Sequence, residues 1–158
     1  MVKVDSNELQ KLYIAYFGRP GDPTGIKYWL SGENELLTIK KISDDLSRQD
    51  EYHNDNYNKS FEFKINKLYL NLFDRKADFD GLNYWMEMVN NQDYEISDIV
   101  YNLLYSINKP YFIDSSQCEQ DLKVLENKII AAEIFTNQIS RSISYINLYQ
   151  PDSIDPWI

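Results

Sequence analysis

The sequence contains the same pattern twice, and this internal repeat constrains the fold more than any other feature. Residues 11–29 return fifty-six positions later as residues 67–85, and nine of the nineteen aligned positions are identical. A repeat of this length usually marks a duplicated supersecondary unit, and such units stack because each has an apolar face that it cannot bury alone. We therefore expect a small tandem-repeat module rather than an enzyme built around one cleft.

Helices are expected throughout both copies, because their apolar residues recur at three- and four-residue spacing. Asp5, Asp22 and Asp78 stand where an N-cap is needed, and Gly18 should end the first helix. The segment Gly32-Glu33-Asn34 should break the second helix, and the Asn-rich segment 52–58 is expected to be the loop between the copies. The expected helices cover about 6–17, 22–31 and 37–52 in the first copy, begin near 61, 78 and 96 in the second, and end with a long amphipathic helix at about 120–140.

The order of these elements predicts an all-α fold of two tandem three-helix repeats and a long C-terminal capping helix. The repeats are expected at residues 1–57 and 58–112, and residues 113–158 should hold the capping helix and an irregular tail from about residue 149. A terminal helix that differs from the repeats is what a two-repeat stack needs to cover its open apolar face. All three parts should therefore pack as one compact unit.

The charge balance argues against several classes of partner. With 16 Lys and Arg against 25 Asp and Glu, the net charge is −9, so no basic stripe is available to neutralise the phosphates of a nucleic acid or an anionic lipid surface. No apolar run is long enough to span a membrane, and no secretory leader is visible. We expect a cytoplasmic protein, a protein exported without a cleaved leader, or a piece of a longer protein. Cys118 is the single cysteine, so no intrachain disulfide and no multi-thiolate metal site can form.

A corner between two helices is the strongest local signal in each copy. Each corner contains an Arg, an Asp and a Gly at matching positions. The Asp can accept hydrogen bonds from the first-turn N–H groups of the second helix, and the Arg can pair with that Asp or cap the preceding helix. The Gly permits close approach of the backbone. We assign this structural role to Arg19, Asp22, Gly25, Arg75, Asp78 and Gly81. The alternative is an oxygen-lined calcium site formed by Asp74, Asp78 and Asp80, although the twelfth-position Glu of an EF-hand loop is missing.

A Tyr-Trp pair follows each corner, one turn beyond the glycine. Trp29 and Trp85 suit the core of a small domain, because so large a ring dominates its packing. If Tyr28 and Tyr84 face outward, the duplication presents two aromatic surfaces that suit sugars, whose C–H faces stack on rings while their hydroxyl groups accept and donate hydrogen bonds. The candidate glycan-binding residues are Lys27, Tyr28, Trp29, Asn83, Tyr84 and Trp85.

Catalytic motifs are missing from the sequence. His53 is the only histidine, nothing places it beside a nucleophile, and no nucleophile elbow, phosphate-binding loop or dinucleotide fingerprint occurs. An enzyme acting on carbohydrate would need two carboxylates about 5 to 10 Å apart across a cleft, and no such pair can be named. We therefore expect no enzymatic activity and no cofactor other than a possible Ca²⁺ ion.

The repeat resembles a bacterial domain of unknown function that recurs in RTX-type secreted proteins and surface-layer (S-layer) proteins. The shared pattern is L-Y-x₃-[FL]-x-R-x₂-D-x₂-G-x₂-Y-W, which occurs twice within residues 8–52 and 64–106, and the helix at 121–136 resembles the one that follows such repeats. The resemblance implies an N-terminal region of the kind that holds Gram-negative S-layers to lipopolysaccharide and that is exported by a type I pathway. Because the domain is also found joined to cytoplasmic sugar-transferring enzymes, a cytoplasmic location remains the alternative.

Two functional hypotheses follow from these observations. The first is a non-catalytic module that anchors an S-layer or other secreted protein to the cell surface by binding polysaccharide, such as the O-chain of lipopolysaccharide. Because the chain is anionic, this hypothesis favours neutral sugars or a bridging divalent cation. The second is a protein–protein interaction scaffold, in which the repeat surface or the helix near 127–136 binds a partner domain or a second copy of the chain.

Overall fold

The computed structural model describes residues 4–31, 37–106 and 115–142 of the chain. In these ranges the chain is helical without any strand, so the all-α class is confirmed. The expected break at 32–34 and the irregular tail from about residue 149 lie outside the described residues. In chain order the helices are α1 (Ser6–Phe17), α2 (Pro23–Leu30), α3 (Ile39–Ser47), α4 (Asp50–Asn56), α5 (Phe61–Phe73), α6 (Phe79–Gln92), α7 (Ile96–Ser106) and α8 (Ser115–Ile139).

Side-chain caps set the starts of the helices where the sequence predicted them. The Asp5 carboxylate accepts a hydrogen bond from the Glu8 backbone N–H at 2.9 Å, which begins α1. Asp22 and Asp78 cap α2 and α6 in the same way. Each cap satisfies an N–H group that has no partner within its own helix, and each contributes about 1 kcal/mol to helix stability.

The expected single helix at 37–52 and the expected loop at 52–58 are both wrong. The chain turns at Arg48 and Gln49, where α3 ends, and re-enters a helix, α4, that covers most of the supposed loop. Asp50 and Glu51 lie in the first turn of α4, where negative charge interacts favourably with the helix dipole. The Tyr52 ring is buried and packs edge-on against Tyr16 at a centroid distance of 5.3 Å. Tertiary packing thus stabilises a helix that the Asn-rich composition disfavours.

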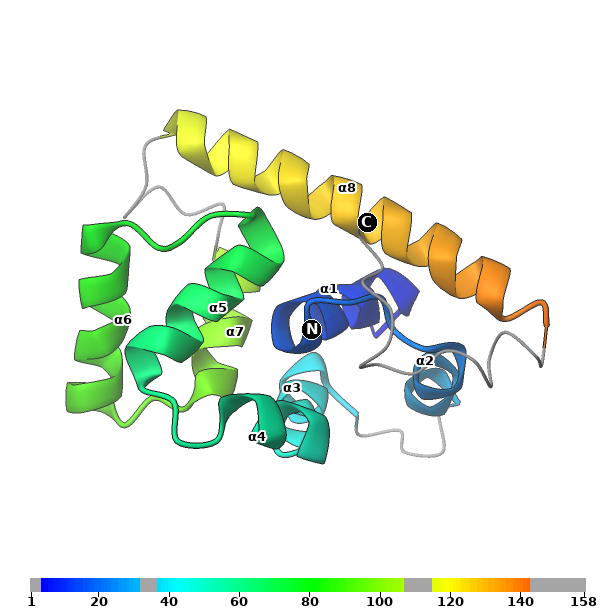
Figure 1. The fold of residues 1–158 in the computed structure, drawn as a ribbon, viewed down its shortest axis with the longest axis horizontal. Coiled ribbons are helices and arrows are strands. Elements are labelled where there is room, and N and C mark those ends of the chain that lie inside the picture. Colours follow the sequence, from blue (N-terminus) through cyan, green and yellow to red (C-terminus); the bar gives the residue numbers. More distant parts are fainter. Residues whose placement is uncertain (1–3, 32–36, 107–114, 143–158) are drawn as a thin grey trace.

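Helix α1 lies at the centre of the molecule and is buried on most of its surface (Figure 1). It packs against α5, the matching helix of the second copy, and against α3 and α8, while α3 packs against α7. The two copies therefore bury their apolar stripes largely against each other. The fully buried side chains of this core include Leu9, Leu12, Ile14, Tyr16, Ile42, Leu46, Ile65, Leu68, Leu72 and Ile99.

Helix α8 runs along one side of the molecule and packs on α1, α2 and α5 (Figure 1). The apolar residues Leu125 and Ala132 of α8 are buried, but so are the polar residues Asp121 and Thr136. Thr136 accepts a hydrogen bond from Gln10 at 2.9 Å and donates to the Gly21 carbonyl oxygen at 2.6 Å. Helix α8 is thus fixed by buried polar contacts as well as by apolar packing. No helix in the described ranges has the length and apolarity needed to cross a membrane.

Candidate functional site

The two corners have the same local geometry. Helices α1 and α5 end at Gly18 and Asp74, which adopt left-handed φ angles of 63° and 57°. The next helix then starts at Asp22 or Asp78, whose carboxylate accepts from the N–H of Gly25 or Gly81 at 2.7 Å in both copies. These contacts give both aspartates a capping role. A Cβ atom on Gly25 would lie 2.1 Å from the Tyr13 hydroxyl oxygen, so the glycine permits the close approach of α1 and α2.

Each corner arginine is held mainly by a carboxylate on a later helix, not by the corner aspartate. Arg19 donates from Nε and Nη2 to Glu51 of α4 at 2.8 and 2.7 Å, and its Nη1 lies 3.7 Å from Asp22. Arg75 donates in the same two-pronged way to Asp121 of α8 at 2.8 and 2.6 Å. These hydrogen bonds raise the pKa of Arg75. The arginine in each copy therefore ties its corner to the helix that follows the third helix of that copy, a role that the sequence analysis missed because the partners lie 32 and 46 residues away.

The Tyr-Trp pairs place the indole inside and the phenol further out. Trp29 and Trp85 are buried, and the Trp85 indole N–H donates to the Tyr69 hydroxyl oxygen at 3.1 Å. Tyr28 is 66% exposed and packs edge-on against Trp29, whereas Tyr84 is half-buried in the same arrangement with Trp85.

The two Tyr-Trp pairs do not form one joint surface. Lys27 and Tyr28 are exposed on α2, and Asn83 is exposed on α6. Figure 1 shows α2 and α6 at opposite ends of the long axis of the molecule. A ligand that uses both pairs must therefore be an extended chain.

The acidic residues of the second corner have separate roles. Asp78 caps α6, Asp80 is exposed in its first turn, and Asp74 pairs with Lys128 of α8 at 2.5 Å. Across the described ranges no three His, Cys, Asp or Glu side chains gather as a metal site would require. A calcium site at Asp74, Asp78 and Asp80 remains a prediction.

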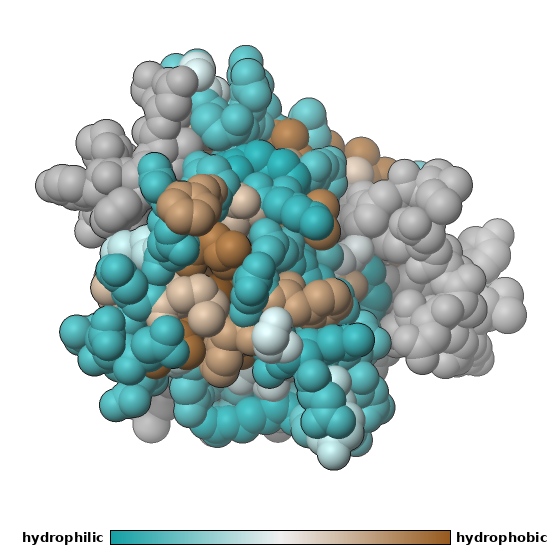
Figure 2. All heavy atoms as spheres, turned by 60° about the vertical axis from the view of Figure 1, so that its left-hand side comes forward, coloured by the Kyte–Doolittle hydropathy of each residue, from teal (hydrophilic) through white to brown (hydrophobic). Residues whose placement is uncertain are grey.

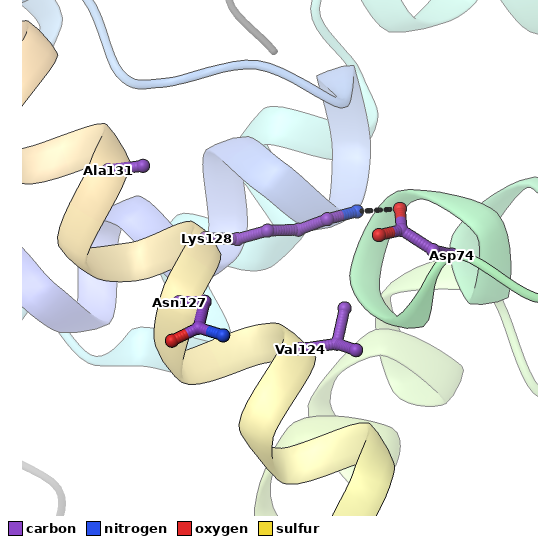
Figure 3. A pocket seen from close by; sticks show the side chains of 5 residues that line it. All are labelled: Asp74, Val124, Asn127, Lys128 and Ala131. Atoms are coloured by element: carbon purple, nitrogen blue, oxygen red, sulfur yellow. Dashed lines mark hydrogen bonds and ion pairs between the residues drawn. The ribbon is translucent and has the colours of Figure 1, made fainter.

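A surface hollow of about 310 Å³ lies where α8 crosses the end of α5. Figure 3 shows Lys128 extending from α8 across this hollow toward Asp74. The Lys128 ammonium also donates to the Asn71 carbonyl oxygen at 2.7 Å, so it caps the C-terminus of α5, where carbonyl groups lack helical partners. The charge of Lys128 therefore stabilises the C-terminal end of α5.

A larger pocket of about 530 Å³ lies beside α4, between the end of α3, the start of α5 and the start of α7. We call it the α4 pocket. Its lining is about equally polar and apolar, and it includes the aromatic rings of Tyr52, His53, Tyr57 and Phe61. Its volume lies within the range of small-molecule sites, which is about 300–1,000 Å³.

Two buried polar atoms in residues that line the α4 pocket have no hydrogen-bond partner among the described residues: the Tyr52 hydroxyl oxygen and the Asn56 Oδ1 atom. The two residues are only 7% and 4% exposed, and they share one face of α4 because they are four positions apart. Burial raises the pKa of Tyr52, so its hydroxyl stays protonated and can donate. A buried group without a partner costs about 1–3 kcal/mol, which a ligand hydroxyl or a bound water can recover.

The outer part of the α4 pocket is aromatic and charged. Tyr57 is 63% exposed and lies 5.4 Å from the His53 ring, centroid to centroid. The Lys64 ammonium lies 5.2 Å over the Phe61 ring. Sequence reasoning missed this site because it treated 52–58 as a linker. The cluster of Tyr, His and Asn in that segment was the only local signal.

Comparison with known families supports part of the expected resemblance. Residues 43–108 match a domain of unknown function (DUF4214). The comparisons with curated proteins and with solved structures gave no match.

The range matched to DUF4214 begins within α3 and ends just after α7. It contains the second corner and every residue that lines the α4 pocket, whereas the first corner lies outside it. The α4 pocket is thus built entirely from the segment that carries the family pattern.

Proposed function

We propose that this chain is a non-catalytic module that anchors an S-layer or other secreted protein to the cell surface by binding polysaccharide, with the O-chain of lipopolysaccharide as the expected ligand. The DUF4214 match supports the resemblance to a domain of unknown function. The S-layer setting is what that resemblance implies. The proposal places the chain at the cell surface.

The α4 pocket is the observation that carries this proposal. Aromatic rings provide flat surfaces for the C–H faces of a sugar, and the Tyr52 hydroxyl and Asn56 amide oxygen provide a donor and an acceptor for its hydroxyl groups.

Tyr28 provides a second aromatic surface for an extended polysaccharide. Its ring is exposed, and its edge-on packing against Trp29 at a centroid distance of 4.9 Å limits its rotation before any ligand arrives. A rigid ring loses little conformational entropy on binding. Two separate contacts on one polysaccharide chain also raise the overall affinity through effective concentration.

The proposal is tested by isothermal titration of purified lipopolysaccharide O-chain from the producing organism. Tyr57→Ala and Tyr28→Ala should each weaken binding by about fivefold or more, because truncation of an aromatic anchor typically costs at least about 1 kcal/mol. Phe79→Ala is the matched control, since Phe79 is exposed on α6 and does not line the α4 pocket. Circular dichroism should show that all three variants keep the native fold. No binding of the wild-type protein to this polysaccharide would refute the proposal.

A protein–protein scaffold is the second candidate function. Figure 2 views the molecule from the α6 side and shows apolar side chains grouped among polar ones. Phe63 and Leu70 of α5 and Phe79 of α6 are exposed, and so are Ile130 and Ile134 of α8. Light scattering at increasing concentration tests self-association directly, and Phe79→Ser and Ile130→Ser should abolish any dimer that forms through these surfaces.

A further inference from the structure

The α4 pocket carries an excess of positive charge on a protein with a net charge of −9. Arg48 and Lys64 line it, and Glu95 is the single carboxylate among its lining residues. Neither cation takes part in any ion pair within the described ranges, whereas Arg19, Arg75 and Lys128 are all paired with carboxylates. The Asp44 carboxylate lies near Arg48 but is already paired with Lys40, so Arg48 and Lys64 can both bind an external anion at this pocket.

The charges in the α4 pocket favour a singly charged anionic group. Two cations and one carboxylate leave a local excess of one positive charge, which matches a carboxylate better than a phosphate with two negative charges. The planar guanidinium of Arg48 also fits a carboxylate in a two-pronged arrangement.

Two buried polar atoms in residues that line the pocket favour a ligand with hydroxyl groups as well. The Tyr52 hydroxyl and the Asn56 Oδ1 atom lack partners, and a simple carboxylate cannot donate to Asn56. A ring-shaped ligand that carries a carboxylate and hydroxyl groups can contact all of these groups. Its carboxylate can bind the two cations, its hydroxyl groups can bond to Tyr52 and Asn56, and its ring can pack against Tyr57.

We propose that the α4 pocket binds an acidic sugar unit, a uronic acid, with its carboxylate at Arg48 and Lys64, its hydroxyl groups at Tyr52 and Asn56, and its ring face against Tyr57. This inference rests on the proposed polysaccharide-binding function and specifies the sugar class. It differs from the neutral sugars that the net charge of the whole chain favoured, because the local charge at the pocket has the opposite sign.

The test compares sugars that differ only at the acidic group. Amide chemical shifts of the full chain are followed during titration with glucuronate, galacturonate and mannuronate, and with glucose, galactose and mannose at matched ionic strength. At least one uronate should bind about tenfold more tightly than its neutral counterpart, because charge-assisted hydrogen bonds are worth more than neutral ones. The shifts should lie at residues 47–61 and 95–96, which surround the α4 pocket. Sodium acetate, as a carboxylate without hydroxyl groups, should bind at least tenfold more weakly than that uronate.

Variants separate the charge contribution from the hydroxyl contribution. Arg48→Gln and Lys64→Gln should each remove most of the preference for the uronate over its neutral counterpart. Lys59→Gln is the charge-matched control, since Lys59 is exposed over Phe63 and does not line the pocket. Tyr52→Phe should weaken sugar binding several-fold without lowering the melting temperature, because it removes a buried hydroxyl that has no partner in the free protein. A purely structural role for Tyr52 predicts lower stability instead.

Each failure has a distinct meaning. The inference is overturned if uronates and neutral sugars bind equally well and the Arg48 and Lys64 variants bind the uronate as the wild-type protein does. The proposal of polysaccharide binding then still stands. Acetate that binds as tightly as the uronates also overturns it, because the site is then a simple anion site. If the lipopolysaccharide O-chain binds while no uronate shifts the pocket residues, the inference is wrong and the proposed function stands. If the O-chain does not bind at all, both are wrong.

Discussion

Replacement of Asp121 by alanine should destabilise the protein more than the loss of an ordinary surface charge. Asp121 is only 1% exposed, and it accepts two hydrogen bonds from Arg75 and a third from Gln117 at 3.0 Å. The Arg75 guanidinium also lies 5.3 Å over the Tyr69 ring, so it cannot easily turn into solvent. Alanine therefore leaves a partly buried cation without its counter-charge.

The expected magnitude follows from the burial of this pair. Removal of one partner of a buried ion pair costs about 3–5 kcal/mol, and the partial exposure of Arg75 places Asp121→Ala near 3 kcal/mol. The matched control is Asp45→Ala, which breaks the largely exposed pair with Lys41 one turn away on α3. That loss should cost about 0.3–0.5 kcal/mol.

Urea denaturation followed by circular dichroism at 222 nm measures both values at neutral pH. For a domain of this size, a loss of about 3 kcal/mol also lowers the melting temperature by about 6–12 °C. A double-mutant cycle with Arg75→Gln isolates the coupling energy of the pair. If Asp121→Ala is no more destabilising than Asp45→Ala, then the corner arginine does not tie α8 to the second copy, and our account of how α8 is held is wrong.

Three further predictions concern the core. Gly25→Ala should lower stability by about 1–3 kcal/mol in a urea titration despite the better helix propensity of alanine, because the new Cβ would lie 2.1 Å from the Tyr13 hydroxyl oxygen. Trp85→Phe should cost about 1–3 kcal/mol by the same assay, because it removes the hydrogen bond to Tyr69 and part of the buried ring; an unchanged midpoint would contradict this packing. Stability should fall as the pH rises above 10, where tyrosines of the unfolded chain ionise, because burial raises the pKa of Tyr16 and other core tyrosines in the folded state. Denaturant midpoints that stay constant from pH 9 to pH 11.5 would argue against buried, protonated tyrosines.

The sequence was sufficient to predict most of the helices because their signals are local. N-caps at Asp5, Asp22 and Asp78 depend only on residues three positions away, and the apolar stripes depend on spacing within one helix. The buried position of Trp29 and Trp85 was also expected, because so large a ring dominates the packing of a small core.

The elements that the sequence did not predict depend on distant contacts. Helix α4 has poor helix-forming composition and is stabilised by Tyr52 against α1 and by Glu51 against the first corner. The partners of the corner arginines lie on α4 and α8, and no local pattern identifies them. Tertiary packing decides both features, so a single sequence without its fold cannot reveal them.

The candidate site also combines features that local sequence signals indicate with features that only tertiary packing creates. The sequence left open whether Tyr28 and Tyr84 face outward. In the structure Tyr28 is exposed, whereas Tyr84 is half-buried at the other end of the molecule. The α4 pocket joins residues from 47 to 96 and exists only because α4, α5 and α7 meet. A segment that looked like a linker therefore supplies five of the eleven residues that line the pocket.

Hydrogen–deuterium exchange of the protein with and without purified lipopolysaccharide O-chain tests the central claim most directly. Our account predicts slower exchange of backbone amides in residues 47–61 and 95–96, with a smaller effect on α2 around Tyr28. Exchange that is unchanged in these segments, or that slows only on α6 and α8, would contradict the claim that the chain binds polysaccharide through the α4 pocket.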